Sequence, residues 1–133
     1  METSEQIDKI AAAFVKAQAT FTKAKKDKNN PFFKSKYADL NGYIDGSAPG
    51  LVDNGLAILQ DTAGSVENSK VQVSTMLLHS SGQWIKSSPL VMISIDNKPQ
   101  TYGLTVTYAR RYSLSSFLGL GAEDDDGNSG NRS

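Results

Sequence analysis

The sequence predicts a single α+β domain in which N-terminal helices precede a three-stranded antiparallel sheet and a long C-terminal helix. Three observations predict this class. Apolar residues recur at helical spacing near the N-terminus, three runs of β-forming residues follow with short turns between them, and a last helical stretch begins at a proline and ends at a glycine. The length of 133 residues fits one domain.

The first helix follows from six apolar residues spaced alternately by three and four positions, namely Ile7, Ile10, Phe14, Ala17, Phe21 and Ala24. Thr3 and Gln6 have the spacing of a capping box at the start of this helix. We expect the helix to fray between Asp27 and Pro31, because the residue before a proline avoids helical angles.

A second, weaker helical pattern covers residues 38–53. Glycines and a proline interrupt it, at Gly42, Gly46, Pro49 and Gly50. Both residue types disfavour a helix interior. We therefore expect a short helix, a break and one further turn, with Asn54-Gly55 as the stop.

Three strands are expected next, at residues 56–60, 71–79 and 84–95. Hairpin loops at residues 63–69 and at Ser80-Ser81-Gly82 would join them. Pro89 cannot donate a ladder hydrogen bond, so the third strand is expected to be an edge or to carry a bulge at that residue.

The final helix is expected over residues 99–118, with Gly119 as its stop. The only charged residues between 99 and 122 are Arg110 and Arg111, so we expect a helix that is buried over most of its surface. Buried arginines need partners. One account is an ion pair within or between subunits, for which the candidates are Asp39, Asp61 and Asp96. The other is phosphate binding in a groove, for which the planar guanidinium is suited.

Composition limits the classes of function. The chain has 14 basic and 14 acidic residues, and a formal net charge of zero excludes an arm that binds nucleic acid by bulk charge alone. The charge is uneven: eight lysines face four acidic residues in 1–37, five basic residues face six acidic ones in 38–122, and one faces four in 123–133. The absence of cysteine excludes disulfides and thiol chemistry. No apolar run approaches the ~18 residues of a membrane span, and we expect no signal peptide.

Residues 32–37 combine three aromatic side chains with Lys34 and Lys36. Aromatic faces beside ammonium groups suit single-stranded nucleic acid, whose bases stack and whose phosphates form ion pairs. In an extended conformation Lys34 and Lys36 share one side of the chain. The alternative is that Phe32-Phe33 anchors a loop in the core.

Five segments, in order and in spacing, resemble the ERF (essential recombination function) family of phage single-strand annealing proteins; they are Asn30–Leu40, Asp53–Ala57, Gly82–Ile85, Thr107–Leu114 and Gly121–Gly127. The resemblance covers roughly residues 5–128. It implies a protein that binds single-stranded DNA and anneals complementary strands without ATP, with a β-β-β-α core that assembles into rings or filaments. The glycines of residues 39–53 depart from the family pattern.

The resemblance also implies the DNA-binding residues. Arg110 and Arg111 occupy the helix that lines the DNA groove in the superfamily, and Lys34 and Lys36 are the second basic element. The other expected DNA contacts are Phe33, Tyr37, Tyr108 and Lys86. No catalytic residue, metal or cofactor is expected, because the sequence has no phosphate-loop motif and His79 is its only histidine.

We therefore expect a non-enzymatic annealing protein of phage homologous recombination in the cytoplasm of the infected bacterial host. Its expected partners are single-stranded DNA, the annealed duplex, further copies of the chain and a host single-strand-binding protein, with no membrane. Residues 1–122 would be the DNA-binding domain and residues 123–133 an acidic tail rich in glycine, serine and asparagine. Two alternatives stay open: a metal-dependent nuclease that uses Asp39, Asp61 or the tail carboxylates, and a protein-interaction module.

Overall fold

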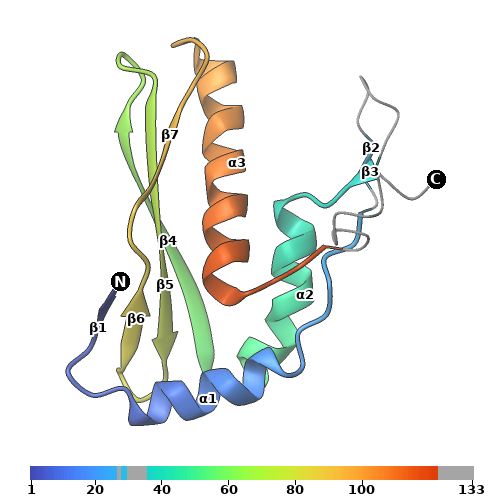
Figure 1. Ribbon diagram of the computed structural model, residues 1–133, viewed down its shortest axis with the longest axis vertical. Helices are drawn as coiled ribbons and strands as arrows, with labels where there is room; N and C mark the ends of the chain where they lie inside the picture. The colour runs from blue at the N-terminus through green and yellow to red at the C-terminus, as the bar shows by residue number, and fades with distance from the viewer. Residues whose placement is uncertain (27, 30–35, 123–133) are drawn as a thin grey trace.

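The computed structural model describes residues 1–26, 28–29 and 36–122, with the backbone alone for residues 28, 29, 36 and 37. Three helices and seven strands lie along this part of the chain (Figure 1). In order they are β1 (Glu2–Thr3), α1 (Asp8–Gln18), β2 (Lys28–Asn29), β3 (Lys36–Tyr37), α2 (Leu40–Asp53), β4 (Leu56–Ser65), β5 (Lys70–His79), β6 (Trp84–Lys86), β7 (Leu90–Ile93) and α3 (Pro99–Leu118). The predicted α+β class is confirmed. Over the described residues, no helix combines the length and the apolar character that a bilayer span requires.

The sheet is built on the β4–β5 hairpin, whose ladder runs from the Leu56–His79 pair to the Ser65–Lys70 pair. β4 is therefore longer than the strand predicted at residues 56–60. The other edge of β5 pairs antiparallel with both β6 and β7, and β1 extends the sheet beyond β6.

The predicted third strand is divided at Pro89 into β6 and β7. Residues 87–89 lie opposite only Ser74 and Thr75, which is the residue count of a β-bulge. Ser87 keeps the ladder satisfied there: its N–H donates to the Thr75 carbonyl (2.8 Å), and its hydroxyl oxygen accepts from the Thr75 N–H (2.9 Å). The interruption predicted from Pro89 is confirmed.

The start of α1 differs from the prediction. β1 pairs with β6, so Thr3 lies outside the helix and the capping box that Thr3 and Gln6 predict is wrong. The cap comes instead from the turn between β5 and β6. Gln83 Oε1 accepts from the N–H groups of Lys9 and Ile10, both at 2.9 Å. A distant side chain thus satisfies two of the first-turn donors that every helix leaves open.

α1 also ends earlier than predicted, at Gln18 rather than near Asp27. The apolar spacing continues past the helix, and Ala24 is still buried. The segment after α1 runs along α2, where the Thr22 N–H donates to the Gly46 carbonyl (3.0 Å). This tertiary backbone contact takes the place of the helical hydrogen bonds that the apolar spacing favours.

α2 is continuous over all its 14 residues, so the predicted break is wrong. The three glycines, spaced four residues apart on one face, are Gly42, Gly46 and Gly50. The segment after α1 crosses this face closely: a Cβ on Gly46 would lie 2.4 Å from the Thr22 carbonyl oxygen. The glycines serve the close approach of two backbones rather than the interruption of a helix.

α3 ends as predicted, with Gly119 in the left-handed conformation at φ 73°. One side of α3 lies along the sheet, and α2 lies on its other side (Figure 1). Buried side chains of β5 and α3 form the core between these two elements: Val71, Val73, Leu77, Ala109, Leu114 and Leu118.

The opposite face of α3 is exposed, which corrects the expectation of a helix buried over most of its surface. Leu104, Tyr108 and Tyr112, spaced four residues apart, lie on this face and are 62%, 46% and 49% exposed. The helix has few charges because its solvent face is aromatic, apolar and hydroxylic, not because that face is covered.

Candidate nucleic-acid interface

Arg111 lies on the exposed face of α3 against two tyrosine rings. Its Cζ atom is 4.9 Å from the ring centroid of Tyr108 and 5.1 Å from that of Tyr112. Both distances allow cation–π attraction. One of its terminal amino groups, Nη2, also donates to the Tyr112 hydroxyl oxygen (3.4 Å). The helix thus presents a guanidinium together with two half-exposed aromatic rings.

Arg111 also joins α3 to the segment before α2. Its Nη1 donates to the carbonyl of Ala38 (3.2 Å), the residue that follows β3. β3 pairs antiparallel with β2, so that Lys28 lies opposite Tyr37 and Asn29 opposite Lys36. The hydrogen bond from Arg111 therefore reaches the residue that directly follows the aromatic and basic segment at residues 32–37. The expected contacts that lie outside the described residues are Phe33 and Lys34, together with the side chains of Lys36 and Tyr37.

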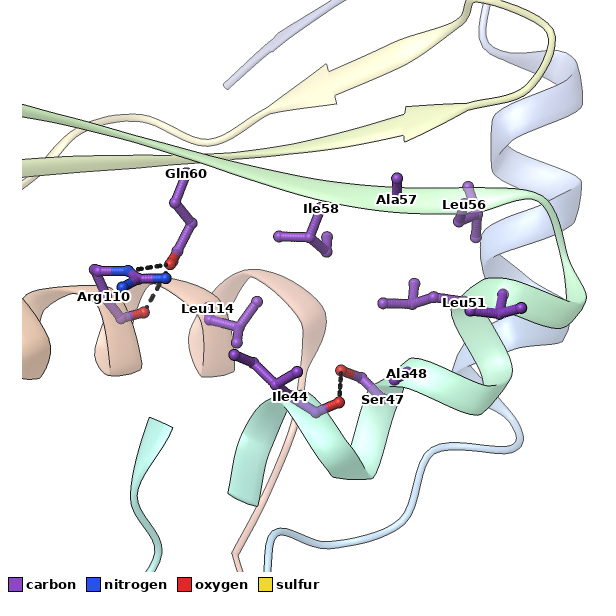
Figure 2. Close-up of a pocket in the computed structure, with 11 residues that line it drawn as sticks. Ile44, Ser47, Ala48, Leu51, Leu56, Ala57, Ile58, Gln60, Arg110 and Leu114 are labelled. Atoms are coloured by element: carbon purple, nitrogen blue, oxygen red, sulfur yellow. Dashed lines mark hydrogen bonds between the residues drawn. The ribbon is translucent and has the colours of Figure 1, made fainter. Parts of the chain in front are cut away.

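Arg110 has a different environment. It is half-buried, and its Nε donates to Gln60 Oε1 of β4 (2.9 Å), while Gln60 Nε2 donates to the Arg110 carbonyl (3.0 Å) (Figure 2). In the part of the chain that the structure describes, the partner of this guanidinium is a neutral amide rather than one of the three candidate aspartates. One of these, Asp39, caps α2 by accepting from the Gly42 N–H (2.9 Å).

An open apolar pocket of about 390 Å³ lies between α2, β4 and α3, with Arg110 and Gln60 at one end (Figure 2). Aliphatic side chains such as Ile44, Ile58 and Leu114 form its walls. None of the residues that line it is acidic. Apolar walls of low dielectric constant extend the field of a charge at the rim of a cleft, so this end of the pocket favours an anion.

Lys86 does not join this group. In β6 the side chain of Ile85 packs against the core, so Lys86 points to the other face of the sheet. Its neighbours across the ladder are Met76 of β5 and Glu2 of β1. Of the eight expected DNA contacts, the structure brings Arg111 and Tyr108 together, places Arg110 one position away on the same helix, and separates Lys86 from them by the sheet.

Two residues at this site were not predicted from the sequence, Gln60 and Tyr112. Tyr112 carries a usable signal, since its spacing of four from Tyr108 places both rings on one helical face. Gln60 carries none, because its contact with Arg110 depends on how β4 packs against α3.

Of the side chains suggested for a nuclease, the tail carboxylates lie outside the described residues, and Asp39 and Asp61 do not form a metal site within them. Among those residues, no three His, Asp or Glu side chains gather closely enough to hold a metal ion. His79, the only histidine, lies at the β5–β6 turn, where its Nδ1 is 2.8 Å from Ser81 Oγ.

Comparisons with known proteins bear on the identity of the chain. Neither curated proteins nor solved structures show significant similarity to it. The family model of the ERF superfamily matches residues 10–133, which includes the arginine pair, the aromatic and basic segment and the acidic run. The chain therefore belongs to the ERF superfamily, whose members act in phage recombination and strand annealing.

Proposed function

We propose that the chain binds single-stranded DNA without sequence preference and anneals complementary strands without ATP, in phage homologous recombination. One observation carries the proposal: Arg111, packed against Tyr108 and Tyr112, is hydrogen-bonded to the carbonyl of Ala38, the residue that directly follows the second group of aromatic and basic residues. Guanidinium groups and exposed rings on one surface fit phosphates and bases of an unpaired strand.

The mechanism requires only binding and release. Arginine forks hold phosphates, which are the same at every nucleotide, so the contacts carry no sequence information. Base edges that remain accessible test a second strand, and Watson–Crick pairing supplies both the specificity and the driving force. No bond is made or broken, so the protein acts as a non-enzymatic binding factor without a cofactor.

We also propose that the active form is a homo-oligomer, either a ring or a filament. One domain offers few phosphate contacts, and repetition would extend one strand along a continuous path. The outer face of the sheet supports self-association, because Leu59, Val91 and Ile93 are exposed there. Val91 and Ile93 are neighbours on this face of β7, and exposed apolar side chains that lie together mark interaction surfaces.

We further propose a division of the chain and a place where the protein acts. Residues 1–122 act as the DNA-binding domain and residues 123–133 as an acidic tail. The protein works in the cytoplasm of the infected bacterium, where the annealed duplex is its product and a host single-strand-binding protein is a further partner.

The deciding experiment follows two complementary oligonucleotides, one with a donor and one with an acceptor fluorophore, without ATP. We expect the protein to accelerate pairing and the particle in solution to exceed the mass of one chain. A parallel reaction with Mg²⁺ or Mn²⁺ measures strand length on a denaturing gel. Shortened strands would support the nuclease instead, and no DNA binding even at low salt would support a protein-interaction module.

A further inference from the structure

Gln60 of β4 makes three hydrogen bonds, two to Arg110 of α3 and one to Thr75 of β5. Its Oε1 accepts from Arg110 Nε at 2.9 Å, and its Nε2 donates to the Arg110 carbonyl at 3.0 Å and to Thr75 Oγ1 at 3.1 Å. One amide therefore binds both the side chain and the backbone of the same arginine. This reciprocal pairing fixes the direction of the amide as well as that of the guanidinium.

The buried hydroxyl groups of Thr75 and Ser113 fix the position of Gln60. Thr75 is fully buried, and its Oγ1 lies 2.6 Å from Oγ of Ser113, which is also buried. Because Thr75 Oγ1 accepts from Gln60, its own hydroxyl proton is available for Ser113. Ser113 is three residues after Arg110 on α3, so the chain of hydrogen bonds returns to the helix on which it begins.

This network leaves the outer edge of Arg110 available. Nε is used by Gln60, while among the described residues Nη1 and Nη2 of Arg110 have no hydrogen-bond partner. The two terminal amino groups form the fork that binds a phosphate through two parallel hydrogen bonds. An arginine whose Nε is already fixed loses less rotamer entropy when a phosphate arrives.

We propose that Gln60 is a positioning residue for DNA binding, which holds the Arg110 guanidinium at the end of the apolar pocket with its terminal amino groups ready for one phosphate. The assignment rests on the proposed function, since it describes how one contact of that site is prepared. Gln60 itself does not touch the DNA, and Thr75 and Ser113 act through Gln60.

The test measures the affinity for fluorescent oligo(dT) at several salt concentrations, with thermal unfolding of each variant. The main variants are Gln60→Leu, Arg110→Ala and the double variant that combines them. Gln72→Leu is the matched control, because Gln72 is half-buried in the same sheet but lies opposite Val91 on the outer face. We expect Gln60→Leu to weaken binding about tenfold, as loss of a hydrogen bond that orients a charged group does, and Gln72→Leu to bind like the original chain.

Two further results separate positioning from general destabilisation. The double variant should bind no more weakly than Arg110→Ala, because Gln60 acts only through Arg110. Gln60→Glu places a carboxylate against Nε, so it should pair with Arg110 and reduce the slope of log affinity against log salt by about one. If Gln60→Leu does not fold, Thr75→Val with Ser113→Ala removes the support while leaving no buried hydroxyl unpaired, and a weakening of about threefold is expected.

The outcomes identify which claim fails. Additive losses in the double variant, or Gln60→Leu binding as tightly as the original chain while Arg110→Ala binds weakly, would overturn the positioning role and leave the proposed function intact. A folded Arg110→Ala variant that binds normally would remove Arg110 from the site and the positioning role with it. Failure of the original chain to bind oligo(dT) at low salt would overturn the proposed function as well.

Discussion

Arg110 and Arg111 are adjacent in the sequence but do separate work in the structure. Adjacent helical residues point about 100° apart. Arg110 therefore reaches Gln60 on β4, while Arg111 reaches the tyrosine rings and the Ala38 carbonyl on the side of α2. Among the described residues, Arg110 pairs with a neutral amide, and Arg111 contacts a carbonyl and two aromatic rings, so the helix carries guanidinium groups with two different environments.

Replacing both arginines with alanine should abolish DNA binding and leave the fold intact. The change removes hydrogen bonds from the two guanidinium groups to Gln60 and Ala38, which lie at the edge of the core. Electrophoretic mobility shift with oligo(dT) measures binding, and circular dichroism measures the fold. A protein that unfolds would instead support the account in which these arginines are structural.

The ring of Tyr108, rather than its hydroxyl group, is expected to matter. Tyr108→Phe keeps the face that packs on Arg111 and should bind DNA normally, whereas Tyr108→Ala should weaken affinity about fivefold to tenfold through lost base stacking and cation–π contact. Leu104→Ala, four residues earlier on the same exposed face, is the control for apolar truncation. Equal losses in Tyr108→Phe and Tyr108→Ala would assign the contribution to the hydroxyl group.

At the scale of elements, the two helical glycines Gly46 and Gly103 are expected to respond oppositely to alanine. A Cβ on Gly46 would meet the Thr22 carbonyl oxygen at 2.4 Å, whereas a Cβ on Gly103 of α3 would meet nothing within 4 Å. Gly46→Ala should lower the free energy of unfolding by about 2 kcal/mol or more, because backbone must move. Gly103→Ala should raise it by about 0.5–1 kcal/mol, because alanine favours helix. Urea denaturation measures both, and a neutral Gly46→Ala would show that the contact is not tight.

The cap of α1 gives a prediction that depends on pH. Gln83→Ala should lower the free energy of unfolding by about 1 kcal/mol, the usual cost of a lost helix cap. In the original chain the hydrogen bond from Gln83 lowers the pKa of Asp8 below its ordinary value of 3.8. A lowered carboxyl pKa stabilises the fold above the unfolded pKa, and the contribution is lost as pH falls through the folded pKa.

The difference in stability between the original chain and Gln83→Ala should therefore narrow in acid. Thermal unfolding at neutral pH and below the lowered pKa of Asp8 measures it, and an NMR titration of Asp8 should show its pKa rising toward 3.8 in the variant. Gln72→Leu, whose side chain is far from α1, serves as the control. A difference that is constant with pH would show that Gln83 acts through the backbone donors alone.

At the scale of the whole molecule, the sequence predicts what depends on local signals. Pro99 and Gly119 bound α3 because first-turn proline and left-handed glycine act within a few residues. Pro89 divides a strand because proline cannot donate a ladder hydrogen bond, which is again a property of a single residue. The arginine pair is visible because it is the only charge in a helix of neutral residues.

The errors come from tertiary contacts that a single sequence does not reveal. Gly46 disfavours a helix locally, yet α2 is continuous because the glycine admits the backbone of Thr22. Thr3 has the spacing of a cap, but pairing with β6 places it in a strand, and Gln83 caps α1 from a position 74 residues after Lys9. The contact between Gln60 and Arg110 is likewise a tertiary contact that the sequence alone does not reveal.

The outer face of the sheet gives the last prediction, because α3 covers only the inner face. Leu59 and Ile93 are 54% and 67% exposed there, and a charge at either position should not disturb the core. If this face joins copies of the chain, Leu59→Asp with Ile93→Asp should lower the particle mass measured by light scattering, and annealing should fall with it. Ile95→Asp is the matched control, since Ile95 is 93% exposed and lies beyond β7. An unchanged mass in the double variant, with the original chain oligomeric, would place the interface elsewhere.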